Sequence, residues 1–262
     1  AFVTAFFITL ITGSVVWYPA RHQHRELKIR DGMLVVVLFW VVLSLFGAIP
    51  LYLFERPFLS ITDAAFEAVS GLTTTGATIL VGIDSLPHSV LWYRQQLHFL
   101  GGMGIIVLAV AILPLLGVGG MQLYRAETPG PMKDAKLTPR ITETAKTLWL
   151  IYIGLNAVCA VAFWLGGMTW FDAICHAVST VATGGFSTHD QSMGYYNSAV
   201  LEGIAVVFMI LGSLNFGLHY LAWRSASVNA YLKDPETRVF FMAVGIVTVI
   251  GTGYLYLDGT YA

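Results

Sequence analysis

The segment TDAAFEAVS, residues 62–70, recurs 109 residues further along the chain as FDAICHAVS, residues 171–179. Each copy runs directly into a short stretch of Thr and Gly, which reads TTTGAT at 73–78 and ATGGFS at 182–187. Both copies lie between apolar stretches long enough to cross a bilayer. A short helix that ends in small residues with an exposable backbone is typical of ion filters. The repeat therefore predicts two such units in this chain.

The composition indicates a membrane protein with several spans. Of the 262 residues, 56% are hydrophobic and only 11% are charged, and the mean hydropathy is +0.72. These values lie outside the range of soluble domains. Cys159 and Cys175 both fall in apolar segments, so we expect two small apolar side chains rather than a disulfide. The chain begins inside one apolar run and stops just after another, and we expect it to be part of a longer protein.

Six stretches lack charge over about 20 residues, the length that a spanning helix needs. The predicted spans are 1–20, 33–54, 95–124, 147–171, 203–223 and 239–257. Glycines and Pro114 in the long third stretch predict a bent or interrupted span. The predicted fold is all-α and integral to the membrane, with six spanning helices and two re-entrant pore helices.

Basic residues fix the orientation of these spans. The linkers 21–32, 125–146 and 224–238 hold 12 of the 14 Lys and Arg residues, and the other linkers hold only Arg56 and Arg94. The positive-inside rule places the three basic linkers in the cytoplasm, and residues 55–94 and 172–202 outside. A solvated loop can be basic for other reasons, but this would not explain the strict alternation along the chain.

The two repeated segments are too short to span. Residues 63–73 would form a helix of roughly 16 Å, about half of the hydrocarbon core, so the segment must enter and leave on the same side. Ser60, Thr62 or Asp63 is expected to cap the first helix, and Asp172 the second. Both copies have the same orientation, which excludes inverted-repeat transporters and water channels. A unit of span, pore helix, Thr/Gly stretch and span is thus predicted twice, at 33–124 and at 147–223, with the linker 125–146 between them.

The Thr/Gly stretches are the candidate site. The offset of 109 residues pairs Gly76 with Gly185, where positive φ would turn successive carbonyl groups toward one axis. Carbonyl oxygens suit an alkali cation, whereas a divalent metal would call for carboxylates, which both stretches lack. Gly and Thr also pack membrane helices, but two matched copies favour a filter. The candidate ion-binding residues are Thr74, Thr75, Gly76, Ala77, Thr183, Gly184, Gly185 and Phe186.

Several ionisable side chains lie near these stretches. Glu67 and His176 occupy equivalent repeat positions, and they either form hydrogen bonds behind the filter or face the outer vestibule. His98 and His219 fall inside predicted spans, where they are either functional groups or hydrogen-bond partners of a neighbouring helix. Scattered His residues do not make a catalytic centre, and the sequence contains no phosphate-binding loop or metal-ligand cluster. We therefore expect no enzyme activity and no nucleic-acid partner.

Five longer runs carry a resemblance to a known family. They are TDAAFEAVSGLTTTGAT (62–78), LGGMGIIVLAVAILP (100–114), GGMQLYRAETPGP (119–131), LTPRITETAK (137–146) and FDAICHAVSTVATGGFSTHD (171–190). With these runs the chain closely resembles the Trk/Ktr/HKT superfamily of potassium transporters, and within it the bacterial TrkH-type pore subunits. The resemblance covers essentially all of residues 1–262.

The resemblance implies more than the residues alone. Members carry four span–pore–span units around one pore, so this chain would hold about two of the four. Residues 1–32 would be the end of an extra N-terminal pair of helices with its basic linker, and 224–262 a linker and the first helix of a third unit. The family assembles as a homodimer in the bacterial inner membrane and works with a cytosolic nucleotide-binding regulatory subunit. It transports K⁺ and needs no tightly bound cofactor.

The resemblance also bears on ion choice. The family's filter glycines match Gly76 and Gly185, and relatives with Ser at the first position tend toward sodium, so Gly76 favours potassium. A sodium-permeable or weakly selective transporter of the same fold is the alternative. Whether flux is channel-like or coupled to H⁺ or Na⁺ stays open at this stage.

Overall fold

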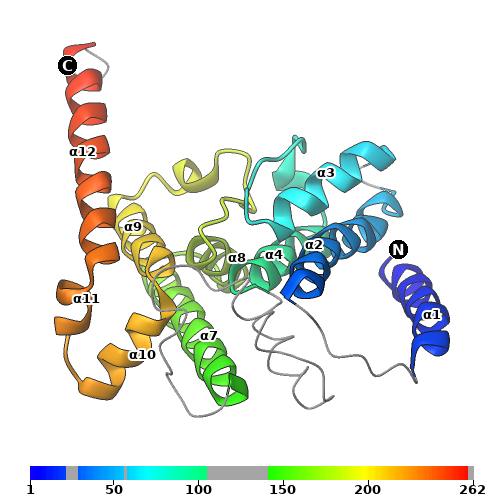
Figure 1. The fold of residues 1–262 in the computed structure, drawn as a ribbon. Coiled ribbons are helices and arrows are strands. Elements are labelled where there is room, and N and C mark those ends of the chain that lie inside the picture. Colours follow the sequence, from blue (N-terminus) through cyan, green and yellow to red (C-terminus); the bar gives the residue numbers. More distant parts are fainter. Residues whose placement is uncertain (22–28, 56–57, 105–140, 259–262) are drawn as a thin grey trace. The chain divides into compact units, whose positions relative to one another are not determined.

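The structure, a computed structural model, describes residues 1–21, 29–55, 58–104 and 141–258 (Figure 1). These residues form helices and connecting loops, and no strand occurs among them. The chain divides into two compact units: the larger includes the described residues up to Ser213, and the smaller begins at Leu214. The all-helical fold agrees with the sequence-based expectation.

The larger unit contains two similar groups of helices. Its elements are α1 (Phe2–Ala20), α2 (Ile29–Tyr52), α3 (Ile61–Leu72), the 3₁₀ turn η1 (Ile83–Ser85), α4 (His88–Gly102), α7 (Ile141–Leu165), α8 (Trp170–Val181), the 3₁₀ turn η4 (Ser192–Tyr196) and α9 (Ala199–Ser213). Helix α3 packs against α2 and α4, α8 packs in the same way against α7 and α9, and α4 also contacts α8. The two segments recognised as a sequence repeat thus occupy matching places between flanking helices.

Helices α3 and α8 are both 12 residues long and begin in the same way. The Ser60 hydroxyl accepts a hydrogen bond from the Asp63 amide at 3.1 Å, and the Thr169 hydroxyl accepts one from the Asp172 amide at 3.2 Å. The predicted short helices are therefore present, and Ser60 was among the expected caps. The expectation that Asp172 caps the second helix was wrong, because Thr169 takes that role and Asp172 occupies the third helical position.

Both short helices end against a glycine of the helix that follows. A Cβ placed on Gly101 of α4 would lie 1.9 Å from the carbonyl oxygen of Leu72, the last residue of α3. A Cβ on Gly212 of α9 would lie 2.2 Å from the carbonyl oxygen of Val181, the last residue of α8. Since Leu72 and Val181 are equivalent repeat positions, Gly101 and Gly212 are equivalent as well, and only Gly fits at either place.

The apolar core of the first group lies where α2, α3 and α4 meet. Ala64 and Ala68 of α3 are fully buried there, packed with Leu51 and Leu97 from the flanking helices. In the second group the cysteines are part of the packing: Cys159 and Cys175 are both buried and both free, as expected.

Among the described residues, three helical stretches are long and apolar enough to cross a membrane: Phe2–Ala20, Lys146–Leu165 and Pro235–Leu257. They correspond to the predicted spans 1–20, 147–171 and 239–257, but the second prediction extends past the end of α7 at Leu165 into the start of α8. The predicted span 33–54 lies in α2, whose apolar part is Val37–Tyr52. The predicted span 95–124 begins in α4, and its remainder lies outside the described residues, as does the predicted linker 125–146 up to residue 140.

The predicted span 203–223 is interrupted. Helix α9 ends at Ser213, and a new helix, α10 (Phe216–Ser225), begins after Asn215. The Asn215 side chain accepts a hydrogen bond from the Gly217 amide at 2.9 Å, which caps the new helix. Composition alone did not reveal this break, because Asn is tolerated inside membrane helices.

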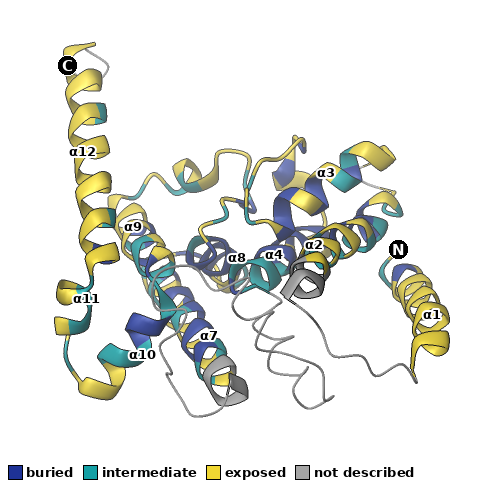
Figure 2. Cartoon of the chain, viewed as in Figure 1, coloured by how far each residue is buried: buried dark blue, intermediate teal, exposed yellow. Residues whose placement is uncertain are grey.

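The smaller unit consists of α10, α11 (Asn229–Lys233) and α12 (Pro235–Leu257). Helix α12 has a favourable N-terminus. Asp234 is the N-cap and accepts a hydrogen bond from the Thr237 amide at 2.7 Å, and Pro235 occupies the first helical position. In both α12 and α1 apolar side chains are exposed along most of the helix (Figure 2). Helices that are apolar all round are suited to contact with lipid or with further membrane helices.

The two glycine contacts generate a stability prediction. Gly101→Ala and Gly212→Ala should each destabilise the protein by about 1–3 kcal/mol, because the new methyl group overpacks a backbone carbonyl that cannot move aside. Thermal unfolding of the purified full-length protein that carries this chain would measure the loss. Gly154→Ala is the control, since it lies in α7 with no atom within 4 Å of the added Cβ. Equal stability of all three variants would contradict the packing described here.

Candidate functional site

The loops that follow α3 and α8 have the same backbone. The amide of Thr75 donates to the Ser70 carbonyl at 2.9 Å, and the amide of Thr74 donates to the Gly71 carbonyl at 3.1 Å. In the second copy the amide of Gly184 donates to the Ser179 carbonyl at 2.8 Å, and Thr183 to the Thr180 carbonyl at 3.0 Å. These paired bonds form a Schellman motif, which ends a helix with one residue in the left-handed region.

Threonine occupies that left-handed position in both copies. The φ angles are 54° at Thr74 and 53° at Thr183. Glycine is the usual residue here, and a β-branched residue with positive φ is a strained outlier. Strain of this kind costs on the order of 1–3 kcal/mol and concentrates at functional sites. Sequence reasoning did not predict it, although the matched Thr pair was a visible signal.

The paired glycines also have positive φ, as predicted, with 72° at Gly76 and 115° at Gly185. Left-handed residues therefore alternate with others along each loop. The loops approach closely: a Cβ on Gly76 would lie 2.0 Å from the carbonyl oxygen of Gly184 and 3.1 Å from the Cα of Gly185. The structure thus brings the central candidate residues of the two copies together.

The carbonyl groups of these loops are free of protein donors. Within the part of the chain that the structure describes, no hydrogen bond reaches the carbonyl oxygens of residues 73–76 or 182–185. Just beyond them, the carbonyl of Ala77 accepts from the Ser70 hydroxyl at 2.6 Å, and that of Phe186 from the Gln95 side chain at 3.2 Å. Most of these residues are exposed or half-buried, so their carbonyl oxygens do not need a protein donor.

Serines at the same place in both copies of the repeat hold the loops to their helices. Ser70 binds the far end of its loop through the Ala77 carbonyl, and the Ser179 hydroxyl accepts from the Gly185 amide at 2.9 Å. Ser179 also pairs with Nδ1 of His98 at 3.2 Å. The sequence analysis missed this role, although a Ser stands at the same place in both copies.

Glu67 and His176 both lie behind the loops, which decides between the two placements left open above. The Glu67 carboxylate is fully buried and accepts from the Thr78 hydroxyl at 2.9 Å. His176 pairs through Nε2 with the Ser187 hydroxyl at 3.0 Å. Thr78 and Ser187 are themselves equivalent in the repeat, so the two copies use different chemistry for one contact.

The two span histidines have partners on neighbouring helices. His98 on α4 reaches Ser179 on α8, its ring stacks on Phe186 with centroids 4.3 Å apart, and Gly184 lies directly against the imidazole. In the smaller unit, Nδ1 of His219 on α10 pairs with the Tyr231 hydroxyl on α11 at 2.7 Å. Both contacts agree with the hydrogen-bonding alternative.

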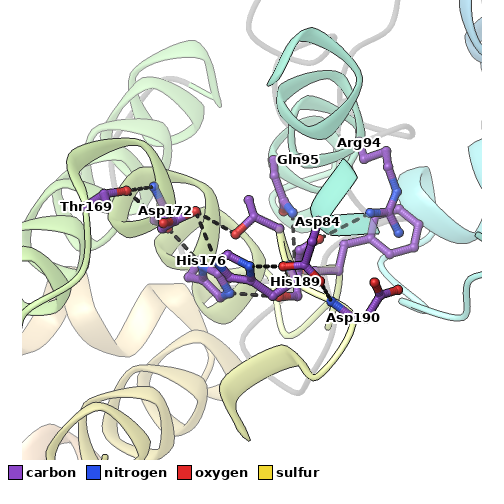
Figure 3. Close-up of polar contacts among 11 residues, drawn as sticks. Asp84, Arg94, Gln95, Thr169, Asp172, His176, His189 and Asp190 are labelled. Atoms are coloured by element: carbon purple, nitrogen blue, oxygen red, sulfur yellow. Dashed lines mark hydrogen bonds and ion pairs between the residues drawn. The ribbon is translucent and has the colours of Figure 1, made fainter. Parts of the chain in front are cut away.

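A second set of contacts joins the outer ends of the two loops (Figure 3). Asp84, which follows the first loop, pairs with Nδ1 of His189 and accepts from the Asp190 amide at 3.2 Å. The ring of His189 stacks on Tyr195, with centroids 3.5 Å apart. Hydrogen bonds from His189 and from the Asp190 amide lower the pKa of Asp84 below its usual 3.8. Among the described side chains, no three His, Cys, Asp or Glu gather as metal ligands would.

Comparisons with known proteins agree on one family. Residues 1–257 match the family model TrkH, described as a cation transport protein. The "Trk system potassium uptake protein TrkH" of Salmonella typhimurium is 56% identical, over 100% of this chain and 54% of the relative. The TrkG protein of Escherichia coli is 46% identical over 93% of this chain and 51% of the relative.

A solved structure agrees as well. The crystal structure of the potassium transporter TrkH from Vibrio parahaemolyticus matches with a TM-score of 0.84 at 50% sequence identity. The match covers 100% of this chain and 53% of that one. The chain spans about half the length of the curated relatives it matches.

The contact between the outer ends of the loops predicts a pH dependence. The lowered pKa of Asp84 means that the fold favours its ionised form, so this stabilisation is present above pH 3.8 and is lost as the pH falls below it. Asp84→Asn should therefore lower the unfolding temperature at neutral pH and have little effect well below pH 3.8. Thermal unfolding of both proteins across this range would measure it. A difference that grows on acidification would contradict the contact.

Proposed function

The chain belongs to the TrkH family of cation transport proteins, and we propose that it forms about half of a potassium uptake protein in the bacterial inner membrane. In this proposal K⁺ crosses through a filter of backbone carbonyl groups, to which the loops after α3 and α8 contribute. The rest of the pore comes from further span–pore–span units of the complete protein. The role is that of a transporter and not of an enzyme.

The observation that carries the proposal is the pair of loops with free carbonyl groups. Residues 73–76 and 182–185 accept no hydrogen bond from the described residues, and left-handed φ angles alternate along them. Such a backbone presents several carbonyl oxygens in a short distance, which is what replaces the hydration shell of K⁺. Neither loop contains a carboxylate, in keeping with a monovalent ion.

The proposed filter residues are those expected from the sequence. The hydrogen bonds divide them into residues with free carbonyl groups and residues whose carbonyl groups are already bonded. The carbonyls of Thr74, Thr75, Gly76, Thr183, Gly184 and Gly185 are the ion ligands. Ala77 and Phe186 stand at the end of the filter, because a side-chain donor already holds each of their carbonyls.

The pore architecture is part of the same proposal. Helices α3 and α8 enter from the outer face, run in parallel to about mid-membrane, and point their negative C-terminal ends toward the ion path. The first span–pore–span unit is 33–124 and the second 147–223, with 125–146 in the cytoplasm. Residues 224–262 lead into a third unit, and 1–32 precede the first. The matching caps and matching glycine contacts of α3 and α8 support this arrangement.

Two protein partners complete the proposal. One is a second copy of the complete protein, and the other is a cytosolic nucleotide-binding regulatory subunit. The basic linkers 21–32, 125–146 and 224–238 would face that subunit. Both partners rest on the family resemblance, and the printed names of the relatives assign those relatives to a Trk system.

The filter assignment predicts a change in ion preference. Gly76→Ser should reduce discrimination of K⁺ over Na⁺, because its Cβ would push on the Gly184 carbonyl and positive φ disfavours any residue but Gly. A shift of ~1.4 kcal/mol between the two ions changes selectivity about tenfold. Gly185→Ser should act through its φ angle of 115° alone, since its Cβ meets only the Gly76 Cα at 3.9 Å. Uptake of both ions is measured in cells that lack other potassium transport.

Gly154→Ser is the matched control, because α7 leaves open space around that position. It should keep the wild-type ion preference. If both filter variants also kept it at comparable expression, these glycines would not belong to the filter. A wild-type protein that passes Na⁺ as readily as K⁺ would favour the sodium-permeable alternative.

The topology gives a separate prediction. In a variant whose native cysteines are replaced, a Cys at Gln191 should react with an impermeant reagent added outside intact cells. A Cys at Lys133 or at Asn229 should react only after the membrane is opened. The reason is the alternation of basic linkers along the chain. Labelling of Lys133→Cys from outside would refute the proposed orientation.

A further inference from the structure

Arg94 is a charged side chain buried between the two copies of the repeat. It belongs to α4 and is 0% exposed. Its Nε donates to Glu67 of α3 at 2.8 Å, and one terminal nitrogen donates to the Thr78 hydroxyl at 3.0 Å. The other terminal nitrogen donates to the carbonyl oxygen of Ser187 at 3.2 Å, which lies just after the second loop. One guanidinium group thus joins the ends of both loops.

The flat face of the Arg94 guanidinium also makes a contact, with the ring of Phe186. Its central carbon lies 4.1 Å from the centroid of the Phe186 ring. The next residue of α4, Gln95, donates to the Phe186 carbonyl at 3.2 Å (Figure 3). We call Arg94, Glu67, Thr78, Phe186 and Ser187 the cross-repeat brace. A rigid planar fork with several donors suits this arrangement, whereas an ammonium group offers a single point of attachment.

Neutralising the charge of Glu67 would not by itself require all the contacts of the cross-repeat brace. An isolated buried ion pair roughly breaks even against apolar residues of the same size, because both groups lose their hydration. In this site only one donor of Arg94 bonds to Glu67, and the others go to acceptors that flank the two loops. The guanidinium is therefore placed where it fixes one loop relative to the other.

The second copy contains no counterpart of this charge. Gly101 of α4 and Gly212 of α9 are equivalent positions, and seven residues before each of them stand Arg94 and Ala205. Helix α9 has neither Lys nor Arg in its sequence. The second copy has His176 in place of Glu67, so no carboxylate there needs an Arg. The link between the copies therefore rests on the bonds that the single Arg94 makes to acceptors beside both loops.

We propose that Arg94 is a positioning residue for ion selectivity, which sets the register of the two loops through the cross-repeat brace. This inference rests on the proposed function, since it assumes that the loops form the filter. Removal of the brace should let the Gly76 and Gly184 backbones shift relative to each other, so that the carbonyl oxygens no longer match the size of K⁺.

The experiment uses the full-length protein and three variants. Arg94→Lys keeps a positive charge beside Glu67 but cannot reach both loops. The double variant Arg94→Met with Glu67→Gln removes both charges together, so no unpaired charge stays buried. Tyr93→Phe is the control: Tyr93 lies on α4 beside Arg94, and the variant removes its hydrogen bond to the Gly47 carbonyl of α2 instead of a bond to the loops. K⁺ and Na⁺ uptake, KM and maximal rate are measured side by side at matched expression.

Arg94→Lys and the double variant should fold and lose K⁺ over Na⁺ discrimination about tenfold, the effect of one hydrogen bond to a charged group. Tyr93→Phe should keep the wild-type preference. If the double variant does not accumulate, Arg94→Lys decides. Wild-type preference in the folded brace variants, or an equal loss in Tyr93→Phe, would overturn the inference.

The same assay includes Gly76→Ser, which separates two kinds of failure. A selectivity change in Gly76→Ser without one in the brace variants would show that the filter is correctly placed and that Arg94 is only structural. No change in any of these variants would instead place the fault in the filter assignment itself.

Discussion

The structure depends on how the carbonyl groups at the ends of the two 12-residue helices, α3 and α8, are bonded or covered. In a membrane, a helix end with unpaired carbonyls is tolerated only where protein or a cavity covers it. Helices α3 and α8 both meet this demand with a Schellman motif and with a glycine, Gly101 or Gly212, that lets the next helix lie directly on the last carbonyl. The Schellman bonds pair the carbonyls of Ser70, Gly71, Ser179 and Thr180, and the last carbonyl of each helix is covered by the glycine. In the loops at 73–76 and 182–185 the carbonyls accept no hydrogen bond from the described residues.

Much of this was predictable from the sequence, because the repeat is gapless across the short helices and loops. The spacing of 109 residues gave the two helices to within two residues and the positive φ of Gly76 and Gly185. Other features depend on contacts that a single sequence does not reveal. Arg94 counted only as a basic residue on the outer side, because its partners Glu67 and Ser187 are 27 and 93 residues away. The break after α9 was missed because one Asn does not distinguish a helix cap from a membrane packing residue.

The two copies share a backbone but differ in the groups that support it. Behind the first loop stands a buried carboxylate, Glu67, whereas behind the second stands His176. The carboxylate needs a cation in a low-dielectric interior, and Arg94 meets that need while it also bonds to the second loop. The imidazole needs no counter-ion, which agrees with the Ala at the position equivalent to Arg94 in α9. The presence of Arg94 in only one copy thus follows from the exchange of Glu67 for His176.

Two unusual backbone features coincide in the loops after α3 and α8. Thr74 and Thr183 adopt a conformation that suits glycine, and next to them lie runs of carbonyls without donors. The conformation of the two Thr residues raises the free energy of the folded chain, so the surroundings must hold it in place. The serine contacts, the buried Arg94 and the stacking of His98 on Phe186 all converge on these loops and supply that support. In the proposed function a cation takes up the carbonyl groups that the described residues leave without a donor. Strain, rigid support and unused ligands at one place are together what a preorganised ion site requires.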